Sequence, residues 1–216
     1  MKKEAKEILT IQNDEIKLSE RSLEIDTKNQ APEMRDIVSQ IKQTMRAKGL
    51  KHLSAPAIGE QRRIFCIDFE DLEIKTYINP ILAECKGLTL SRETCECIPG
   101  KTFLVPRNND ITAIYQRPTG QAETRQFLGA AAIVFQHELN HLDGVLLSDI
   151  GLEFDDDFDN ATEQERSEII AMYLDSLDLR AKDLQNEIEE DPDLKEINDG
   201  IKFMEGIAKG EIKQDL

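Results

Sequence analysis

The chain has 216 residues, of which 32% are charged, and a formal net charge of −16. This length allows one domain with a substantial core plus an appendage, and it argues against several independent domains. From residue 154 onward 20 acidic residues stand against 7 basic ones, and so negative a surface argues against direct nucleic-acid binding and against a membrane as partners.

The N-terminal segment MKKEAKEILTIQNDEIK lacks the apolar stretch of about 7–15 residues that a secretory signal needs. No run of about 18 apolar residues occurs in the sequence either. We therefore expect a soluble, cytoplasmic protein. In that compartment cysteines stay reduced, which favours metal-binding or catalytic roles over disulfides for the four thiols, Cys66, Cys85, Cys95 and Cys97.

The first half of the chain predicts one helix followed by strands. Residues 31–48 carry apolar side chains at helical spacing, with Pro32 near the start and Gly49 just past the end. Runs of β-branched and aromatic residues then predict strands, the last two of which flank a turn at Pro118-Thr119-Gly120 and should form a hairpin. These strands are expected at residues 63–68, 75–79, 111–116 and 123–127.

The second half predicts helices. Residues 129–143 have helical composition and end before Gly144. A further helix should begin at Thr162, whose spacing to Glu165 fits a capping box, and another at Asp191-Pro192. The acidic third is thus expected to form a helical hairpin whose apolar stripes pack against the domain, a second copy of the chain or a protein partner.

A candidate metal site lies in residues 136–144, QHELNHLDG. His137 and His141 are about one helical turn apart and share a face, and Glu138 is close enough to reach a water beside a bound ion. An HExxH string alone is only moderately specific, and two ordinary histidines on a polar helix face remain the alternative. No histidine follows His141 that could supply a third ligand, but Cys95, upstream in RETCECIPG, could complete the site.

Three segments, in this order, resemble the motifs of the peptide deformylases, which remove the N-terminal formyl group from nascent polypeptides. The family motifs read roughly GxGLAAPQ, EGCLS and QHExDH. Here residues 50–59 read LKHLSAPAIG, residues 93–97 read ETCEC and are followed by IPG, and the third segment departs only by Asn140 for the usual Asp. The resemblance covers about residues 30–150. It is more specific than HExxH because three segments match in order.

The resemblance implies an α+β fold with small antiparallel or mixed sheets around a central metal-binding helix, in a metallohydrolase domain spanning residues 1–153, followed by an acidic helical extension, residues 154–216. It implies that Cys95, His137 and His141 hold a divalent ion, with Fe²⁺ expected and Zn²⁺, Ni²⁺ or Co²⁺ able to replace it. Glu138 would be the general base that takes a proton from water and returns it to the leaving amine. The expected substrate is an N-formylated peptide or a related small amide, in the N-terminal processing step of protein biosynthesis.

The departures from the motifs bear on activity. The family stabilises the developing oxyanion with the glutamine that ends the first motif and with the backbone N–H after the metal cysteine. The second donor remains as Glu96 N–H, but Ala57 stands in place of the glutamine, and losing one such donor typically costs on the order of 10²–10³ in rate. We therefore expect a weak or altered deformylase, or one in which another side chain replaces the glutamine. His52 is one candidate; a plain loop histidine is the alternative.

Two neighbours of the ligands also have open roles. Glu93 would orient a ligand or its loop, as its family counterpart implies; the alternative is an exposed strand-edge acid. Cys97, which would point the same way as Cys95 if the segment is extended, is an alternative ligand, a disulfide partner on oxidation, or a small buried residue.

Two other functions compete with the enzyme. One is a catalytically inactive deformylase-like protein that keeps its metal and acts through binding. The other, a zincin-type protease, is disfavoured by the absent downstream ligand and by Cys95.

Overall fold

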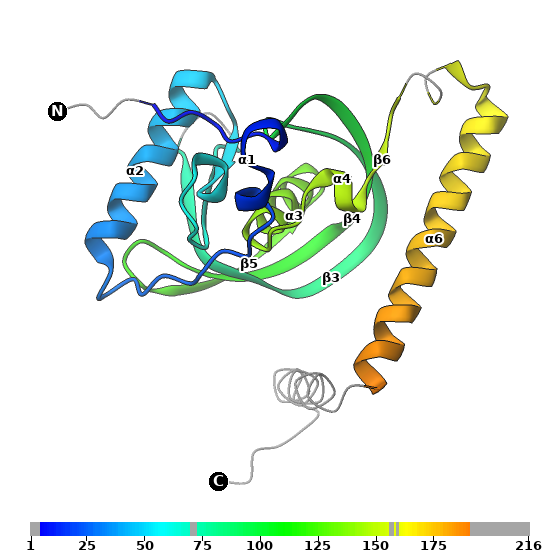
Figure 1. Cartoon of the computed structure of the whole chain (residues 1–216). Helices are drawn as coiled ribbons and strands as arrows, with labels where there is room; N and C mark the ends of the chain where they lie inside the picture. The colour runs from blue at the N-terminus through cyan, green and yellow to red at the C-terminus, as the bar shows by residue number, and fades with distance from the viewer. Residues whose placement is uncertain (1–4, 70–72, 156–157, 159, 191–216) are drawn as a thin grey trace, which may run out of the picture. The chain divides into compact units, whose positions relative to one another are not determined.

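The computed structural model describes residues 5–69, 73–155, 158 and 160–190 (Figure 1). The chain divides into two compact units, residues 1–155 and 156–216. The second helix of the expected acidic hairpin, from Asp191 onward, lies outside the described residues. No helix in the described ranges is both long and apolar enough to span a membrane.

The N-terminal unit is built on one six-stranded antiparallel sheet in the order β1-β2-β3-β4-β5, with β6 paired to β4. The expected α+β class is therefore confirmed. The strands are β1 His52–Ser54, β2 Ile64–Ile67, β3 Lys75–Cys95, β4 Ile98–Gln116, β5 Ala122–Leu128 and β6 Leu152–Glu153.

The predicted helices are present in the described part of the chain. The helix expected over 31–48 has those bounds, and Gly49 ends it with a φ of 70°. The C-terminal helix begins with the expected capping box, since Thr162 N donates to Glu165 Oε2 (2.8 Å) and Glu165 N donates to Thr162 Oγ1 (3.3 Å). The helical segments are α1 Ile11–Leu18, α2 Ala31–Lys48, η1 Pro56–Ile58, α3 Ala130–Leu142, α4 Leu147–Ile150 and α6 Glu163–Glu190.

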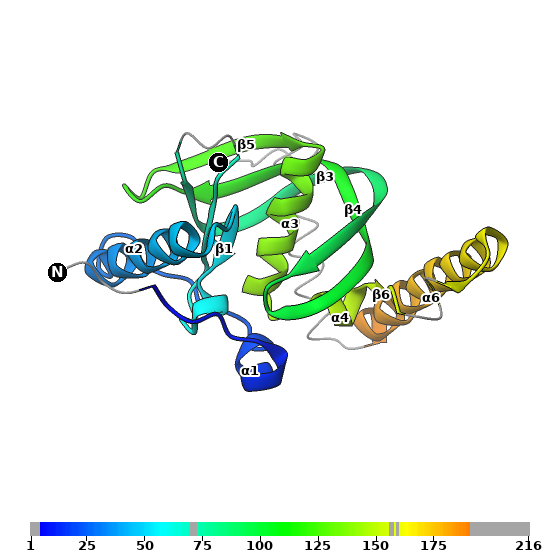
Figure 2. The ribbon, with the colours of Figure 1, turned by 90° about the horizontal axis from the view of Figure 1, so that it is seen from above.

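The long β3–β4 hairpin is the main difference from the sequence prediction. The strand expected at 75–79 continues to Cys95, and the one expected at 111–116 already begins at Ile98. Most residues between 81 and 92 are exposed or only half-buried, so the buried–exposed alternation that announces a strand is missing there. Figures 1 and 2 show this hairpin curving around α3.

An aromatic cluster holds α3 against the sheet. The ring of Phe135, on α3, lies 4.7 Å from Phe127, 5.0 Å from Phe65 and 5.3 Å from Tyr77, measured between centroids. All four rings are buried. Because Phe135 precedes His137 by two residues, the packing of this ring fixes the position of the helix that carries both histidines.

The end of α3 is fixed by a close backbone contact. Gly144, which follows the helix, has a φ of 71°, and a Cβ at this position would lie 2.4 Å from the carbonyl oxygen of Ser19. Only glycine fits here without moving the backbone.

Candidate metal centre

α3 and the end of β3 bring together three buried side chains whose atoms are typical metal ligands. One ligand-type atom each from Cys95, His137 and His141 lies within 4.8 Å of the others. Cys95 Sγ is 3.2 Å from His141 Nε2. The two histidines project from α3, and the cysteine is the last residue of β3. The structure thus gathers the three predicted ligands, although Cys95 lies more than 40 residues before the two histidines in the chain.

The environment of Cys95 favours a thiolate. Its pKa is lowered by a hydrogen bond from Cys97 and, against the opposing effect of burial, by His141 and His137. The thiolate is the form that binds metals. The strand ends at Cys95 and pairs with Ile98, so Glu96 and Cys97 form the turn between β3 and β4.

Cys97 lies in this turn and not in an extended segment, and the interpretation of it as a small buried residue is confirmed. It is buried, and its backbone N–H donates to Cys95 Sγ at 3.4 Å. Among the described residues, the group of potential ligands includes Cys95 and not Cys97. The other two cysteines lie away from this group: Cys66 is buried in β2 and Cys85 is exposed on β3.

Glu93 orients one of the histidines. Its Oε2 lies 2.9 Å from His137 Nδ1, and Arg107 donates to both carboxylate oxygens (2.7 and 2.9 Å). Burial opposes ionisation of Glu93, but the bonds from His137 and Arg107 outweigh it and lower its pKa to about 2. An ionised carboxylate can only accept, so Nδ1 carries the proton and Nε2 keeps its lone pair for a metal. Because Glu93 is buried, the exposed strand-edge reading is wrong.

Two arginines that sequence reasoning missed support the site. Arg107, on β4, also donates to Asn140 on α3, the residue that replaces the family aspartate. Arg63 is buried, lies 2.6 Å from Asp143 and contacts the Leu142 carbonyl at 3.3 Å, which fixes the C-terminal end of α3. Neither arginine lies within a motif, and the only signal in the sequence is a charged residue beside an apolar strand run.

Glu138 is buried beside His52. Its Oε1 lies 2.5 Å from His52 Nδ1, while Oε2 has no hydrogen-bond partner among the described residues. Burial opposes the charged form, but the bond from His52 and the neighbouring histidines outweigh it and lower the pKa of Glu138. His52 is therefore no plain loop histidine: it is the donor to the predicted base.

A small cleft connects these groups. It has a volume of about 20 Å³, which is room for about one water molecule, and its lining includes Cys95, His137, Glu138 and His141. His52, Ala57 and Glu96 line it too. The side chain of His52 is 32% exposed. His52 thus lies at the edge of the cleft in which Ala57 replaces the motif glutamine.

The residues present fit a divalent transition-metal ion. A thiolate and two imidazoles form a three-ligand set of the kind that leaves one position open in catalytic sites. Two buried polar atoms here lack a hydrogen-bond partner among the described residues, Glu138 Oε2 and His141 Nδ1. Such atoms are expected where the site also holds an ion and water.

The sequence of this region matches known proteins. A sequence model of the polypeptide deformylase family matches residues 5–152. The peptide deformylase of Dictyoglomus turgidum is 32% identical over 120 residues, which are 56% of this chain and 78% of that protein. The peptide deformylase of Dictyoglomus thermophilum is 39% identical over 101 residues, 47% of this chain and 65% of the relative.

Solved structures show the same similarity. The peptide deformylase of Thermotoga maritima superposes with a TM-score of 0.62 at 25% identity, covering 68% of this chain and 98% of that one. The peptide deformylase of Synechococcus elongatus in complex with actinonin gives a TM-score of 0.61 at 27% identity, covering 70% of this chain and 84% of that one. The family match includes both β3 and α3, the elements that carry the three ligand-type side chains.

Proposed function

The chain belongs to the polypeptide deformylase family, and we propose that it hydrolyses the N-terminal formyl group of formyl-methionyl peptides in a metal-dependent reaction that releases formate. The observation that carries this proposal is the grouping of Cys95, His137 and His141 beside the buried carboxylate of Glu138. A purely structural metal site would have no use for that carboxylate.

Three residues would hold the ion, and the rest of the site would handle protons and charge. A divalent cation bound by Cys95, His137 and His141 would act as a Lewis acid that lowers the pKa of water toward neutrality. Glu138 would take a proton from the attacking water at Oε2, since Oε1 is already bonded to His52. It would then pass that proton to the leaving amine, which yields formate and a free N-terminus.

The developing oxyanion needs donors, and this chain differs from its family there. We propose that the Glu96 backbone N–H is one donor, because the residue lines the cleft directly after Cys95. Ala57 has no side-chain donor. His52 lines the same cleft, and because its Nδ1 donates to Glu138, we propose that it orients the base and does not replace the glutamine as an oxyanion donor.

The substrate class follows from the family. The Synechococcus elongatus relative was solved in complex with actinonin. For this chain we propose an N-formylated peptide or a related small amide. Ferrous iron is the expected metal by family, and zinc, nickel or cobalt suit the same donor set.

The decisive measurement is formate release from a formylated peptide by the iron-loaded protein under anaerobic conditions. Glu138→Gln keeps the side-chain volume but removes the base, and we expect turnover to fall by about 10²–10⁴-fold with the metal content unchanged. If wild-type protein with a full complement of metal released no formate, the deformylase proposal would be wrong, although the family membership would stand.

The ligand set has its own test. Cys95→Ser replaces the thiolate with a much weaker ligand, and we expect the metal content of the purified protein to fall by at least about tenfold. Cys85→Ser, which removes an exposed thiol from the same strand, is the matched control and should bind metal normally. Normal metal content in the Cys95 variant would refute its assignment.

A second candidate function is a catalytically weakened or inactive member of the family that acts through binding. The alanine at position 57 and the small volume of the cleft favour it. Metal-loaded protein that binds a formylated peptide and does not turn it over would select this alternative.

A further inference from the structure

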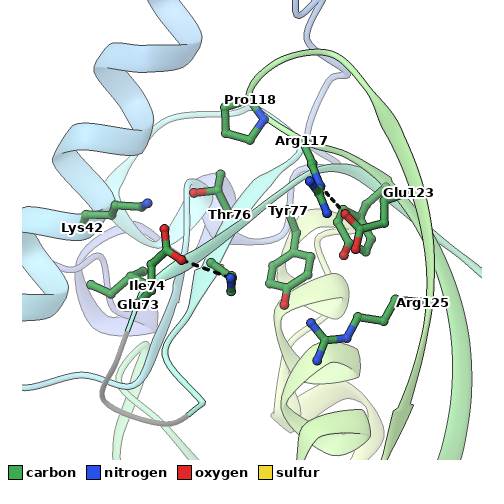
Figure 3. Close-up of a pocket in the computed structure, with 11 residues that line it drawn as sticks. Lys42, Glu73, Ile74, Thr76, Tyr77, Arg117, Pro118, Glu123 and Arg125 are labelled. Carbon is green, nitrogen blue, oxygen red and sulfur yellow. Dashed lines mark hydrogen bonds and ion pairs between the residues drawn. The ribbon is translucent and has the colours of Figure 1, made fainter.

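A second cavity lies apart from the metal centre and shares no lining residue with its cleft. It has a volume of about 370 Å³ and lies among α2, the start of β3 and the end of the β4–β5 hairpin (Figure 3). β3 pairs with β2 from Lys75 but with β4 only from Ile78 onward, so the sheet is split at this point. The cavity fills the split.

The lining of this cavity is positively charged. Its two carboxylates are already paired, Glu73 with Lys75 at 3.1 Å and Glu123 with Arg117. Two further cations, Lys42 and Arg125, form no ion pair with any carboxylate in the described ranges. Among the described lining residues this leaves an excess of two positive charges, in a chain with a net charge of −16.

The cavity also has an unsatisfied hydroxyl on its wall. Tyr77 is 1% exposed, and its hydroxyl has no hydrogen-bond partner among the described residues. Figure 3 shows this hydroxyl directed to the side of the cavity where Arg125 lies. The Tyr115 ring packs against Tyr77 at 4.7 Å between centroids and lines the same cavity. A buried hydroxyl without a partner is costly, and an oxyanion is a good acceptor for it.

We propose that this cavity binds a small anion that carries a carboxylate or phosphate group, held by the Arg125 charge and the Tyr77 hydroxyl, with Lys42 adding positive charge from the opposite side. The volume lies within the range of about 300–1,000 Å³ that is typical of small-molecule sites. The paired residues Glu73 and Glu123 cannot repel such an anion strongly, because Lys75 and Arg117 neutralise them. This site is independent of the proposed deformylase reaction.

Tyrosine fluorescence of the full-length protein is a direct probe. The chain has no tryptophan and three tyrosines, two of which line the cavity. We expect inorganic phosphate or acetate to give a saturable change that chloride at equal ionic strength does not give. Comparing phosphate with acetate tells which oxyanion the cavity prefers.

Variants separate binding in the cavity from general charge effects. Arg125→Gln should weaken binding of the preferred anion about tenfold or more, since it removes a charged contact, and Lys42→Gln should weaken it less, since Lys42 lies on the opposite side of the cavity. Lys48→Gln removes one charge from an exposed position on the same helix as Lys42 and should leave binding unchanged. Equal weakening by Lys48→Gln, or no saturable change with either anion, would overturn the proposal.

Tyr77→Phe tests the hydroxyl. It should weaken anion binding while keeping the unfolding temperature, because the removed group has no hydrogen-bond partner in the described part of the chain. Tyr115 still reports binding in this variant. Unchanged affinity in Tyr77→Phe would show that the hydroxyl does not contact the anion. Unchanged affinity in both Tyr77→Phe and Arg125→Gln would contradict the proposal.

Discussion

His52 and Ala57 are the two residues at which the cleft of the metal centre departs most from the family motif. The second glycine of that motif is replaced by His52 and the final glutamine by Ala57. Both residues line the same cleft of about 20 Å³. A cleft of this volume leaves little room for a glutamine side chain at position 57 beside the His52 ring. We therefore expect the two substitutions to be coupled, so that variants at these positions do not act additively.

The coupling predicts the behaviour of three variants. His52→Gly removes the donor to Glu138, and we expect kcat to fall about tenfold or more with the metal content retained. Ala57→Gln alone should give little gain while His52 occupies the cleft. The double variant should exceed the His52→Gly enzyme by on the order of 10²–10³ in kcat, the usual value of one oxyanion donor.

Steady-state kinetics with a formylated peptide gives kcat and KM for each variant, and thermal unfolding of the same samples controls for stability. Unchanged turnover in His52→Gly would mean that His52 contributes only to packing and does not assist Glu138. Equal turnover in the double variant and in His52→Gly would show that the missing glutamine is not what limits the rate.

At this scale the candidate ligands, the candidate base and Glu93 could be named from the sequence, but the two supporting arginines could not. His137, Glu138, His141 and Cys95 stand in motifs with a stated chemistry, so each could be named from its segment. Arg107 and Arg63 act through contacts 14 to 80 residues away in the chain, to Glu93 and Asp143. Such pairs depend on the register of the strands, which the pattern of residue types does not contain.

α3 is the element on which the site depends, and Phe135 is its main anchor. Phe135→Ala should lower the free energy of unfolding by about 3–5 kcal/mol, because the ring is fully buried among three other aromatic rings. Urea unfolding measures the loss. Metal affinity should fall with it, since the cavity lets the histidine-bearing helix move.

Leu128→Ala is the control for Phe135→Ala, because Leu128 is a large apolar residue that is 60% exposed beside Phe127 on β5. Its free energy of unfolding should change by less than about 0.5 kcal/mol. A similar loss in both variants would mean that the aromatic cluster is not what holds α3.

Helices were easier to predict than strands for a physical reason. α2 buries one face along its whole length, so its apolar period and its capping residues agree on the bounds 31–48. β3 buries side chains only near its two ends, and its central part is held by pairing with β4, whose alternate residues are buried but include polar ones such as Arg107. Backbone pairing leaves no periodic signal in the sequence, so only fragments of these strands could be predicted.

At the scale of the whole molecule, charge and core are divided between different parts of the chain. The two hydrophobic clusters contain no described residue beyond Ile150. The family match ends at residue 152. The residues from 154 onward carry −13 of the net charge of −16. We propose that the metallohydrolase domain is self-sufficient and that the acidic extension mainly sets the charge of the molecule.

A chain that ends at Asp155 tests this division. The cut keeps β6 and the contact of Phe154 N with the Thr102 carbonyl (2.8 Å), and it removes 19 acidic and 7 basic residues. Because both hydrophobic clusters remain complete, we expect the unfolding temperature to change by no more than about 4 °C, with metal content and formate release per molecule retained. The shortened chain should elute from an anion exchanger at clearly lower salt, since most of its negative charge is gone.

A large drop in unfolding temperature together with loss of metal would mean that the extension contributes to the fold of the domain. Loss of turnover with metal and stability intact would instead assign the acidic segment a part in handling the substrate.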